Sequence, residues 1–162
     1  DYIGTYNLPE AELDRFFMKL SMGYPSKEEE RDMVNRFINN RKWREIDAVI
    51  GQDEIVEMQQ EITNIEVNED IIDYILNITE KTRNNEHIEL GISPRATLDW
   101  IKGSQAMAYC NKREYVIPDD VIEIFKPIIE HRIILSSEAK MNQMSCEKVL
   151  ESIRYSVKVP IF

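Results

Sequence analysis

The stretch GISPRATLDWIKGSQAMA, residues 91–108, contains the clearest helix start in the chain. Ser93 is a preferred N-cap residue, and Pro94 suits the first helical position because that position needs no intrahelical N–H donor. Residues spaced by three and four then follow, as on one face of a helix. The pattern predicts a helix from Pro94 whose buried stripe is Leu98, Ile101, Gln105 and Ala108.

Similar signals on both sides of this stretch predict further helices. Ser26 and Glu29 form the capping box S-x-x-E, and Asn39-Asn40 ends the helix that follows. Asp53 and Asn68 can cap the next two helices. The expected buried residues are Met33, Val34, Phe37 and Ile38, then Ile55, Met58 and Ile62, then Ile71, Ile72, Ile75 and Leu76.

The C-terminal third continues the helical pattern. Asn84-Asn85 closes the helix that Asn68 opens, and Tyr115-Val116-Ile117 is a short extended piece. Pro118 and Ser145 begin the last two helices. Their expected buried residues are Val121, Phe125, Ile128 and Ile129, then Val149, Ile153 and Val157. The predicted fold is mainly α, a small helical bundle.

Residues 16–22, FFMKLSM, differ because apolar side chains alternate with period two, which is typical of a strand. One strand cannot satisfy its own backbone groups, and the rest of the chain offers few partners. Because the chain also begins at Asp1 without a methionine, we expect a longer protein whose missing part holds the sheet. The predicted domains are residues 1–25, a strand-containing remnant, and residues 26–162, the helical bundle.

The composition excludes several classes of protein. The 30 acidic and 20 basic residues give a net charge of −10, which disfavours nucleic acid as a partner. No apolar run approaches the length of a membrane-spanning helix. Cys110 and Cys146 are too few for a disulfide framework, so they are interpreted as packing residues of a cytoplasmic protein.

Familiar catalytic and metal-binding motifs are absent from the sequence. No glycine pair has the spacing of the phosphate loop G-x-x-x-x-G-K-[ST], and no histidine or cysteine pair has zinc-ligand spacing. His87 and His131 are interpreted as surface or cap residues. Asp119-Asp120 could resemble a magnesium site after a strand, but acids after Pro118 fit a helix's first turn better. No metal ligand is predicted.

Two arginines carry the candidate function. A cation at Arg95 opposes the helix macrodipole, which makes sense if an anion docks there, and equally if Arg95 is exposed or paired with an acid such as Glu89. Arg15 lies between an acidic segment and the predicted strand, where an ion pair is the usual role. The residues alone leave these alternatives open.

A family resemblance favours the functional alternative. Residues 4–16, GTYNLPEAELDRF, closely resemble the stretch GTYPLPEAQLDRF of MoxR-type AAA+ ATPases, with Asn7 in place of a proline. Residues 91–96, GISPRA, resemble the family's GASPRA. Residues 23–30, 115–121 and His131-Arg132 continue the pattern in order. The resemblance implies the end of an AAA+ core followed by its helical lid domain.

The resemblance also implies roles and partners. Arg15 would be the arginine finger, which reaches ATP on a neighbouring subunit, and Arg95 would be the lid's sensor 2, which contacts ATP of its own subunit. By this resemblance, the intact protein would use ATP and Mg²⁺ and form a hexameric ring, with clients that carry von Willebrand A-type domains. The chain alone is expected to bind neither cofactor and to be inactive. Two alternatives remain, namely a non-enzymatic helical interaction module and a DNA-binding helix-turn-helix protein, which the charge of −10 disfavours.

Overall fold

The computed structural model describes residues 8–39 and 46–161, and it divides the chain into two compact units. The first unit contains the chain up to Lys19 and again from Gln59 onward, and the second contains Leu20–Met58. Helices dominate, which confirms the mainly α fold predicted from the sequence. The division predicted at residue 25 stays a prediction.

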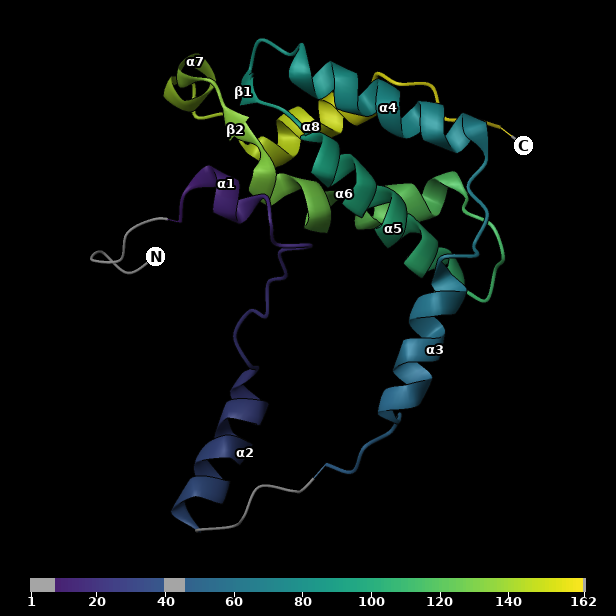
Figure 1. The fold of residues 1–162 in the computed structure, drawn as a ribbon. Coiled ribbons are helices and arrows are strands. Elements are labelled where there is room, and N and C mark those ends of the chain that lie inside the picture. Colours follow the sequence, from purple (N-terminus) through teal and green to yellow (C-terminus); the bar gives the residue numbers. More distant parts are fainter. Residues whose placement is uncertain (1–7, 40–45, 162) are drawn as a thin grey trace. The chain divides into compact units, whose positions relative to one another are not determined.

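The first unit holds most of the secondary structure. Its helices are α1 (Glu10–Leu13), α4 (Glu69–Arg83), α5 (Pro94–Cys110), α6 (Pro118–Ile129), α7 (Ser137–Met141) and α8 (Cys146–Tyr155), with a short 3-10 turn, η1 (Glu130–Arg132). Two short strands, β1 (Ile88–Leu90) and β2 (Ile134–Leu135), pair antiparallel. Figure 1 shows α5 and α6 side by side, with α1 beside the start of β2.

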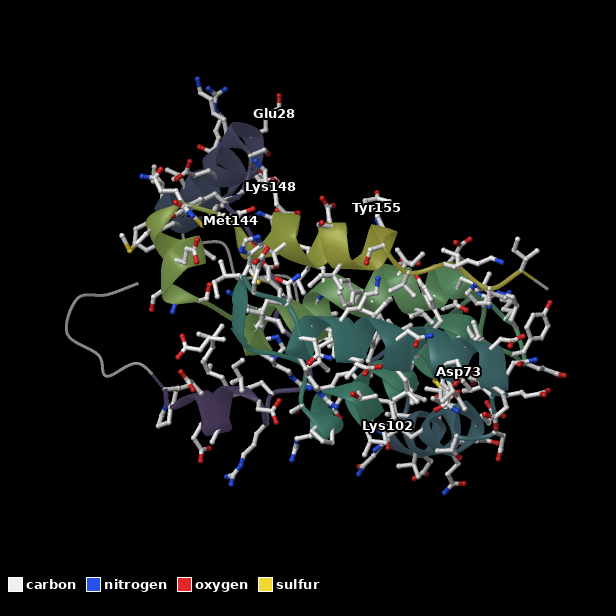
Figure 2. The ribbon with its side chains drawn as sticks, turned by 90° about the horizontal axis from the view of Figure 1, so that it is seen from above. Glu28, Asp73, Lys102, Met144, Lys148 and Tyr155 are labelled. Carbon is white, nitrogen blue, oxygen red and sulfur yellow. The ribbon has the colours of Figure 1, made fainter. Side chains whose placement is uncertain are left out.

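The core forms where α4, α5, α6 and α8 meet. Its largest fully buried side chain is Trp100 on α5, whose Nε1–H donates to the Val121 carbonyl at 2.8 Å. The Trp100 ring lies 4.8 Å from that of Phe125, centroid to centroid. All four apolar residues predicted to be buried on α6, and Val149 and Ile153 on α8, are buried. Figure 2 shows Lys148 and Tyr155 projecting from the outer side of α8, which confirms an amphipathic helix.

The buried stripe predicted for α5 is partly wrong. Ala108 is buried, and Gln105 is half-buried and donates to the Ile65 carbonyl, but Leu98 is 61% exposed. The buried face instead contains Trp100 and the small residues Ala96, Thr97, Gly103, Ser104 and Ala108. A Cβ added at Gly103 would lie 2.5 Å from Ile128 Cδ1, so α5 and α6 approach too closely there for a larger side chain.

The second unit contains α2 (Lys27–Ile38) and the start of α3 (Gln52–Ile62). The predicted capping box is formed, because Ser26 and Glu29 each bind the other's backbone N–H. The cap predicted at Asp53 is wrong, since α3 already begins at Gln52 and Glu54 binds the N–H of Gly51 at 2.7 Å. The apolar residues predicted to be buried on α2 are not, because no residue of that helix is buried.

The strand predicted for residues 16–22 is not formed. Among the described residues, one backbone–backbone hydrogen bond joins this segment to the bundle, from the Lys19 N–H to the Pro127 carbonyl at 2.8 Å. Met18 packs half-buried against the core, whereas Phe16 is 55% exposed. The physical reason is that a strand needs a neighbouring strand, and the described residues supply none beside this segment.

Among the described residues, no helix combines the length and the hydrophobicity that crossing a bilayer requires. The elements that position the candidate site are α1, the start of α5 and the turn η1, and all three belong to the first unit.

Candidate anion site at the start of α5

The start of α5 is fixed by local contacts on both sides of Ser93. Ser93 Oγ accepts from the N–H of Ala96 at 3.0 Å, which is the N-cap bond predicted from the sequence. The preceding Ile92 is buried, and its N–H donates to Thr82 Oγ1 at 3.1 Å. A Cβ added at Gly91 would lie 2.8 Å from the backbone of α4, so only glycine lets this loop approach α4 so closely.

Arg95 follows in the first turn, and its side chain is 56% exposed. Its closest polar contacts are long, with Nε 3.9 Å from Asp99 Oδ2 and Nη2 3.5 Å from the Arg15 carbonyl. The pairing with Glu89 weighed from the sequence is replaced by this weak contact with Asp99. The guanidinium group therefore keeps most of its capacity to bind an anion.

The backbone contributes less to this site than the sequence indicates. Pro94 has no N–H, and the N–H of Ala96 already binds Ser93 Oγ. The helix terminus therefore offers few free donors, and anion binding here rests mainly on the guanidinium group of Arg95.

Arg15 lies just after α1, and its side chain is 66% exposed. Its Nη1 is 3.2 Å from Glu12 Oε1, an ion pair on the surface. Exposed pairs of this kind contribute about 0–1 kcal/mol, so a phosphate could displace Glu12 at low cost. The two arginines identified from the sequence are therefore brought together, since Arg95 reaches the Arg15 backbone, while both side chains stay accessible.

Asp14 ties the segment before Arg15 to the start of α5. Both of its carboxylate oxygens accept from Ser93 Oγ–H, at 2.9 and 3.1 Å. The same hydroxyl accepts from Ala96, so one side chain caps α5 and holds the Arg15 segment. Asp14 was not identified as a site residue from the sequence, although its place directly before Arg15 was a usable signal.

Arg132 is the second residue that the sequence analysis did not assign to the site. Its side chain is 1% exposed, and its Nη2 donates to Asp99 Oδ2 at 2.7 Å and to the Phe16 carbonyl at 2.6 Å. Its Nε lies 3.8 Å from Asp14 Oδ1. Arg132 thus joins Asp99, the carboxylate nearest to Arg95, to the residues that flank Arg15.

The charges of this region are nearly balanced. Three arginines, Arg15, Arg95 and Arg132, face three carboxylates, those of Glu12, Asp14 and Asp99. Asp99 lies closer to Arg132 than to Arg95, so much of its charge is compensated by the buried guanidinium. A phosphate that approaches Arg95 or Arg15 would therefore meet an exposed cation without strong repulsion, in a chain whose net charge is −10.

The other residues considered from the sequence lie elsewhere. Asp120, at the start of α6, is buried and binds Arg113 through both oxygens, and it accepts from the Ile117 N–H at 2.9 Å. This is the helix-start role favoured above. In the part of the chain that the structure describes, no group of three histidine, cysteine, aspartate or glutamate residues could hold a metal ion.

The two cysteines differ in their surroundings. Cys110 is exposed, so its prediction as a packing residue is wrong. Cys146 is half-buried against the core, and burial raises the pKa of its thiol to about 11. A thiol with so high a pKa is a poor nucleophile at neutral pH, which fits a packing role.

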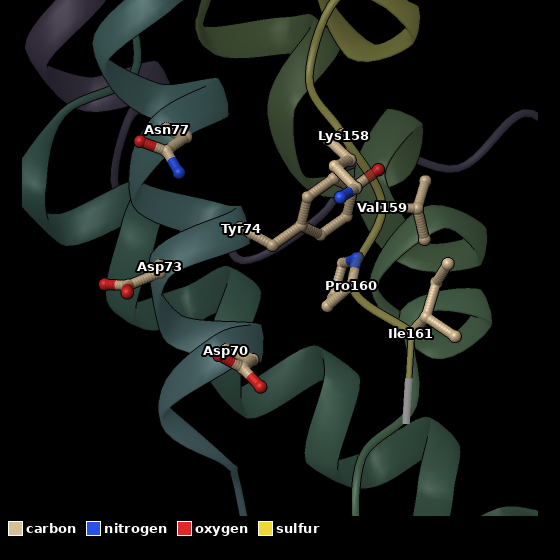
Figure 3. Close-up of a pocket in the computed structure, with 8 residues that line it drawn as sticks. All are labelled: Asp70, Asp73, Tyr74, Asn77, Lys158, Val159, Pro160 and Ile161. Carbon is tan, nitrogen blue, oxygen red and sulfur yellow. The ribbon is translucent and has the colours of Figure 1, made fainter.

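A separate pocket lies between α4 and the C-terminal tail. It has a volume of about 300 Å³ and is lined by Asp70, Asp73, Tyr74 and Asn77 on one side and by residues 158–161 on the other (Figure 3). Burial raises the pKa of Tyr74, whose hydroxyl has no hydrogen-bond partner among the described residues. The pocket includes neither Arg15 nor Arg95, so it is distinct from the candidate anion site.

Comparisons with known proteins agree with this reading of the fold. Residues 80–153 match the family model of the AAA lid domain. The chain is 38% identical over 161 residues to the Bacillus subtilis protein YeaC and 32% identical over 170 residues to the chaperone MoxR1 of Mycobacterium tuberculosis. Each alignment covers 99% of this chain, but 50% of YeaC and 44% of MoxR1.

A solved structure shows the same arrangement. The crystal structure of a candidate ATPase from Cytophaga hutchinsonii superposes with a TM-score of 0.87 and 30% identity, over 99% of this chain and 52% of that protein. The chain thus spans about half the length of the relatives it matches. By its match to the AAA lid domain, its relatives and its fold, the chain is similar over nearly its whole length to part of the MoxR-type AAA+ proteins.

Proposed function

We propose that this chain is the part of an ATP-driven AAA+ machine that senses and completes the nucleotide site, with Arg95 as sensor 2 and Arg15 as arginine finger. The observation that carries the proposal is that a buried network anchors the backbone around both arginines, whereas both guanidinium groups remain exposed. Anchored but accessible cations can stabilise charge that develops on a transferred phosphoryl group.

The two arginines would serve different nucleotides. Arg95 would contact the ATP of its own subunit, and Arg15 would reach the ATP of the next subunit in a ring. Because both lie in one compact unit, a change of the nucleotide on either side would be transmitted to the other through the lid. The intact protein would use ATP with Mg²⁺ and pass the motion to client proteins.

The first test measures ATP binding and hydrolysis by the full-length protein. Arg15→Ala should leave ATP binding within about 3-fold of wild type and reduce turnover by about 10³-fold, because a finger acts mainly on the transition state. Arg95→Ala should weaken ATP binding as well. Unchanged turnover in both variants would refute both arginine assignments, whereas absence of turnover in the wild-type protein would favour the non-enzymatic interaction module.

A second test distinguishes whether Arg15 acts on the ATP of the neighbouring subunit or on the ATP of its own subunit. Arg15→Ala and Arg95→Ala subunits are purified separately, mixed in equal amounts and allowed to exchange. If Arg15 acts on the neighbour, about one interface in four pairs an intact Arg95 with an intact Arg15, and turnover recovers to about a quarter of wild type. If both arginines act on the ATP of their own subunit, no recovery occurs.

The assembly and the clients are proposed on the resemblance to MoxR-type chaperones. We expect a ring, with six subunits as the expected size, whose formation is promoted by ATP. Sedimentation with and without nucleotide measures the size of the assembly. Clients with von Willebrand A-type domains should raise the ATP turnover of the full-length protein, and failure of a purified domain of this type to do so would count against that client class.

A further inference from the structure

Arg132 is the most deeply buried charged side chain near the candidate site. Its side chain is 1% exposed, and it lies 116 residues along the chain from Phe16, whose carbonyl it binds at 2.6 Å. A guanidinium group is tolerated inside a protein only where carboxylates or carbonyls compensate it. Here that compensation comes from the Asp99 carboxylate and from the segment that carries Arg15.

The contacts of Arg132 fall on both sides of Arg15. Nε lies 3.8 Å from the Asp14 carboxylate, and Nη2 binds the carbonyl of Phe16. The backbone before and after Arg15 is therefore held from within the bundle. Arg15 itself remains exposed, so its side chain is directed by residues that it does not touch.

His131 strengthens the same contact. Its Nε2 lies 3.0 Å from the Phe16 carbonyl and 3.3 Å from Arg132 Nε, so the tautomer decides whether it donates to Phe16 or accepts from Arg132. In either tautomer His131 links η1 to the contact between Arg132 and Phe16. Asp99 accepts from the same Nη2 of Arg132 and also faces Arg95 at 3.9 Å, so the network reaches both arginines.

We propose that Arg132, assisted by His131, is a positioning residue that holds the backbone on both sides of Arg15 and so sets the direction in which Arg15 reaches the neighbouring nucleotide. This inference rests on the proposed function for its catalytic consequence. The anchoring itself is a property of the chain, and it can be tested without ATP.

The first experiment measures amide hydrogen exchange in the 162-residue chain. Arg132→Lys keeps the charge, but its single ammonium group cannot lie near Asp14, as Nε does, while also binding Phe16 and Asp99, as Nη2 does. Exchange of residues 14–19, which include the Lys19 N–H bound to Pro127, should accelerate about 10-fold or more. Peptides from α4 and α6 should keep wild-type rates. Unchanged exchange at residues 14–19 overturns the anchoring.

A matched control guards against a general loss of stability. Arg113→Lys makes the same substitution at another arginine that binds a buried carboxylate, that of Asp120, in the same unit. It should leave residues 14–19 protected. If Arg132→Lys fails to fold, His131→Phe removes the polar link to Phe16 and Arg132, while His131→Gln retains a group that can donate or accept, and only the first should accelerate exchange.

The second experiment measures ATP turnover by the full-length protein. Arg132→Lys should lower kcat about 10- to 100-fold and leave KM within about 2-fold, since a misdirected finger is lost chiefly in the transition state. Combined with Arg15→Ala, it should cause no further loss, because a positioning residue has nothing left to position.

The two proposals fail in different ways. If Arg15→Ala leaves turnover unchanged, the finger assignment is wrong, and with it the catalytic role of Arg132. If Arg15→Ala abolishes turnover but Arg132→Lys leaves kcat unchanged or adds its loss to that of Arg15→Ala, the proposed function stands and the positioning role is overturned.

Discussion

Ser93 offers a quantitative test of how the Arg15 segment is attached. Its hydroxyl accepts from the Ala96 N–H and donates to Asp14, so Ser93→Ala removes two bonds. Loss of an N-cap costs about 1 kcal/mol. Loss of a hydrogen bond to a carboxylate costs about 1.5–3 kcal/mol, and the lower end applies because Asp14 is 28% exposed. The expected destabilisation is about 2.5 kcal/mol.

Ser145→Ala is the matched control. Ser145 caps α8 through the Lys148 N–H at 3.2 Å, and within the described part of the chain its hydroxyl makes no bond to a carboxylate like that of Ser93. This substitution should therefore cost about 1 kcal/mol. The difference of about 1.5 kcal/mol between the two variants measures the bond to Asp14. Urea unfolding followed by far-UV circular dichroism gives both values, provided that the slopes agree.

Two further substitutions at Ser93 sharpen the test. Asparagine can cap α5 and still donate to Asp14, whereas aspartate caps equally well but repels the Asp14 carboxylate. We therefore expect Ser93→Asn to be more stable than Ser93→Asp at neutral pH. If Ser93→Ala costs no more than Ser145→Ala, or if the two polar variants are equal, the link between α5 and the Arg15 segment does not exist.

Three other predictions concern the packing at Gly91, the ion pair of Asp120 and the two thiols. Gly91→Ala should destabilise the chain by about 1–3 kcal/mol in urea unfolding, because the added Cβ meets the backbone of α4. Asp120→Asn should lower stability by about 2 kcal/mol, because it removes the carboxylate that raises the pKa of Arg113, and an unchanged thermal midpoint would contradict this role. At pH 8, iodoacetamide should modify the exposed Cys110 well before Cys146. The modification rate of Cys146 should rise about 10-fold per pH unit up to pH 11, where its thiol ionises. Equal rates for the two cysteines in the native chain would show that Cys146 is not buried.

Helix starts were predictable because their signals are local. Ser26, Asn68, Ser93 and Ser145 each bind an N–H two or three residues ahead, so a few adjacent letters contain the whole interaction. Asp53 shows the limit of this reasoning, since α3 begins one residue before it. The position of a start is therefore less certain than its existence.

The buried face of α5 was harder to predict because bulky apolar residues were taken as the signal. Where α5 meets α6, the contact requires small residues, and a side chain at Gly103 would collide with Ile128. Leu98 is apolar but lies on the outer face. Periodicity finds a helix, but which face is buried depends on the shape of the partner helix.

The candidate site shows the same division between local and distant information. Arg15 and Arg95 were identified from short motifs. Arg132 could not be assigned a role from the sequence, because its role depends on contacts with Phe16 and Asp99, which lie 116 and 33 residues away in the chain. A single sequence contains no local pattern for a contact of that kind.

The first unit is discontinuous in sequence, since the second unit, Leu20–Met58, separates its N-terminal segment, which ends at Lys19, from the part that begins at Gln59. Cleavage by a protease within Leu20–Met58 would break the covalent link between the segment that contains Arg15 and the bundle. Only its contacts, such as those of Asp14 with Ser93 and of Lys19 with Pro127, would then retain it. The N-terminal segment would then behave as a bound peptide, and a synthetic peptide of the same sequence could compete with it for its binding surface on the bundle.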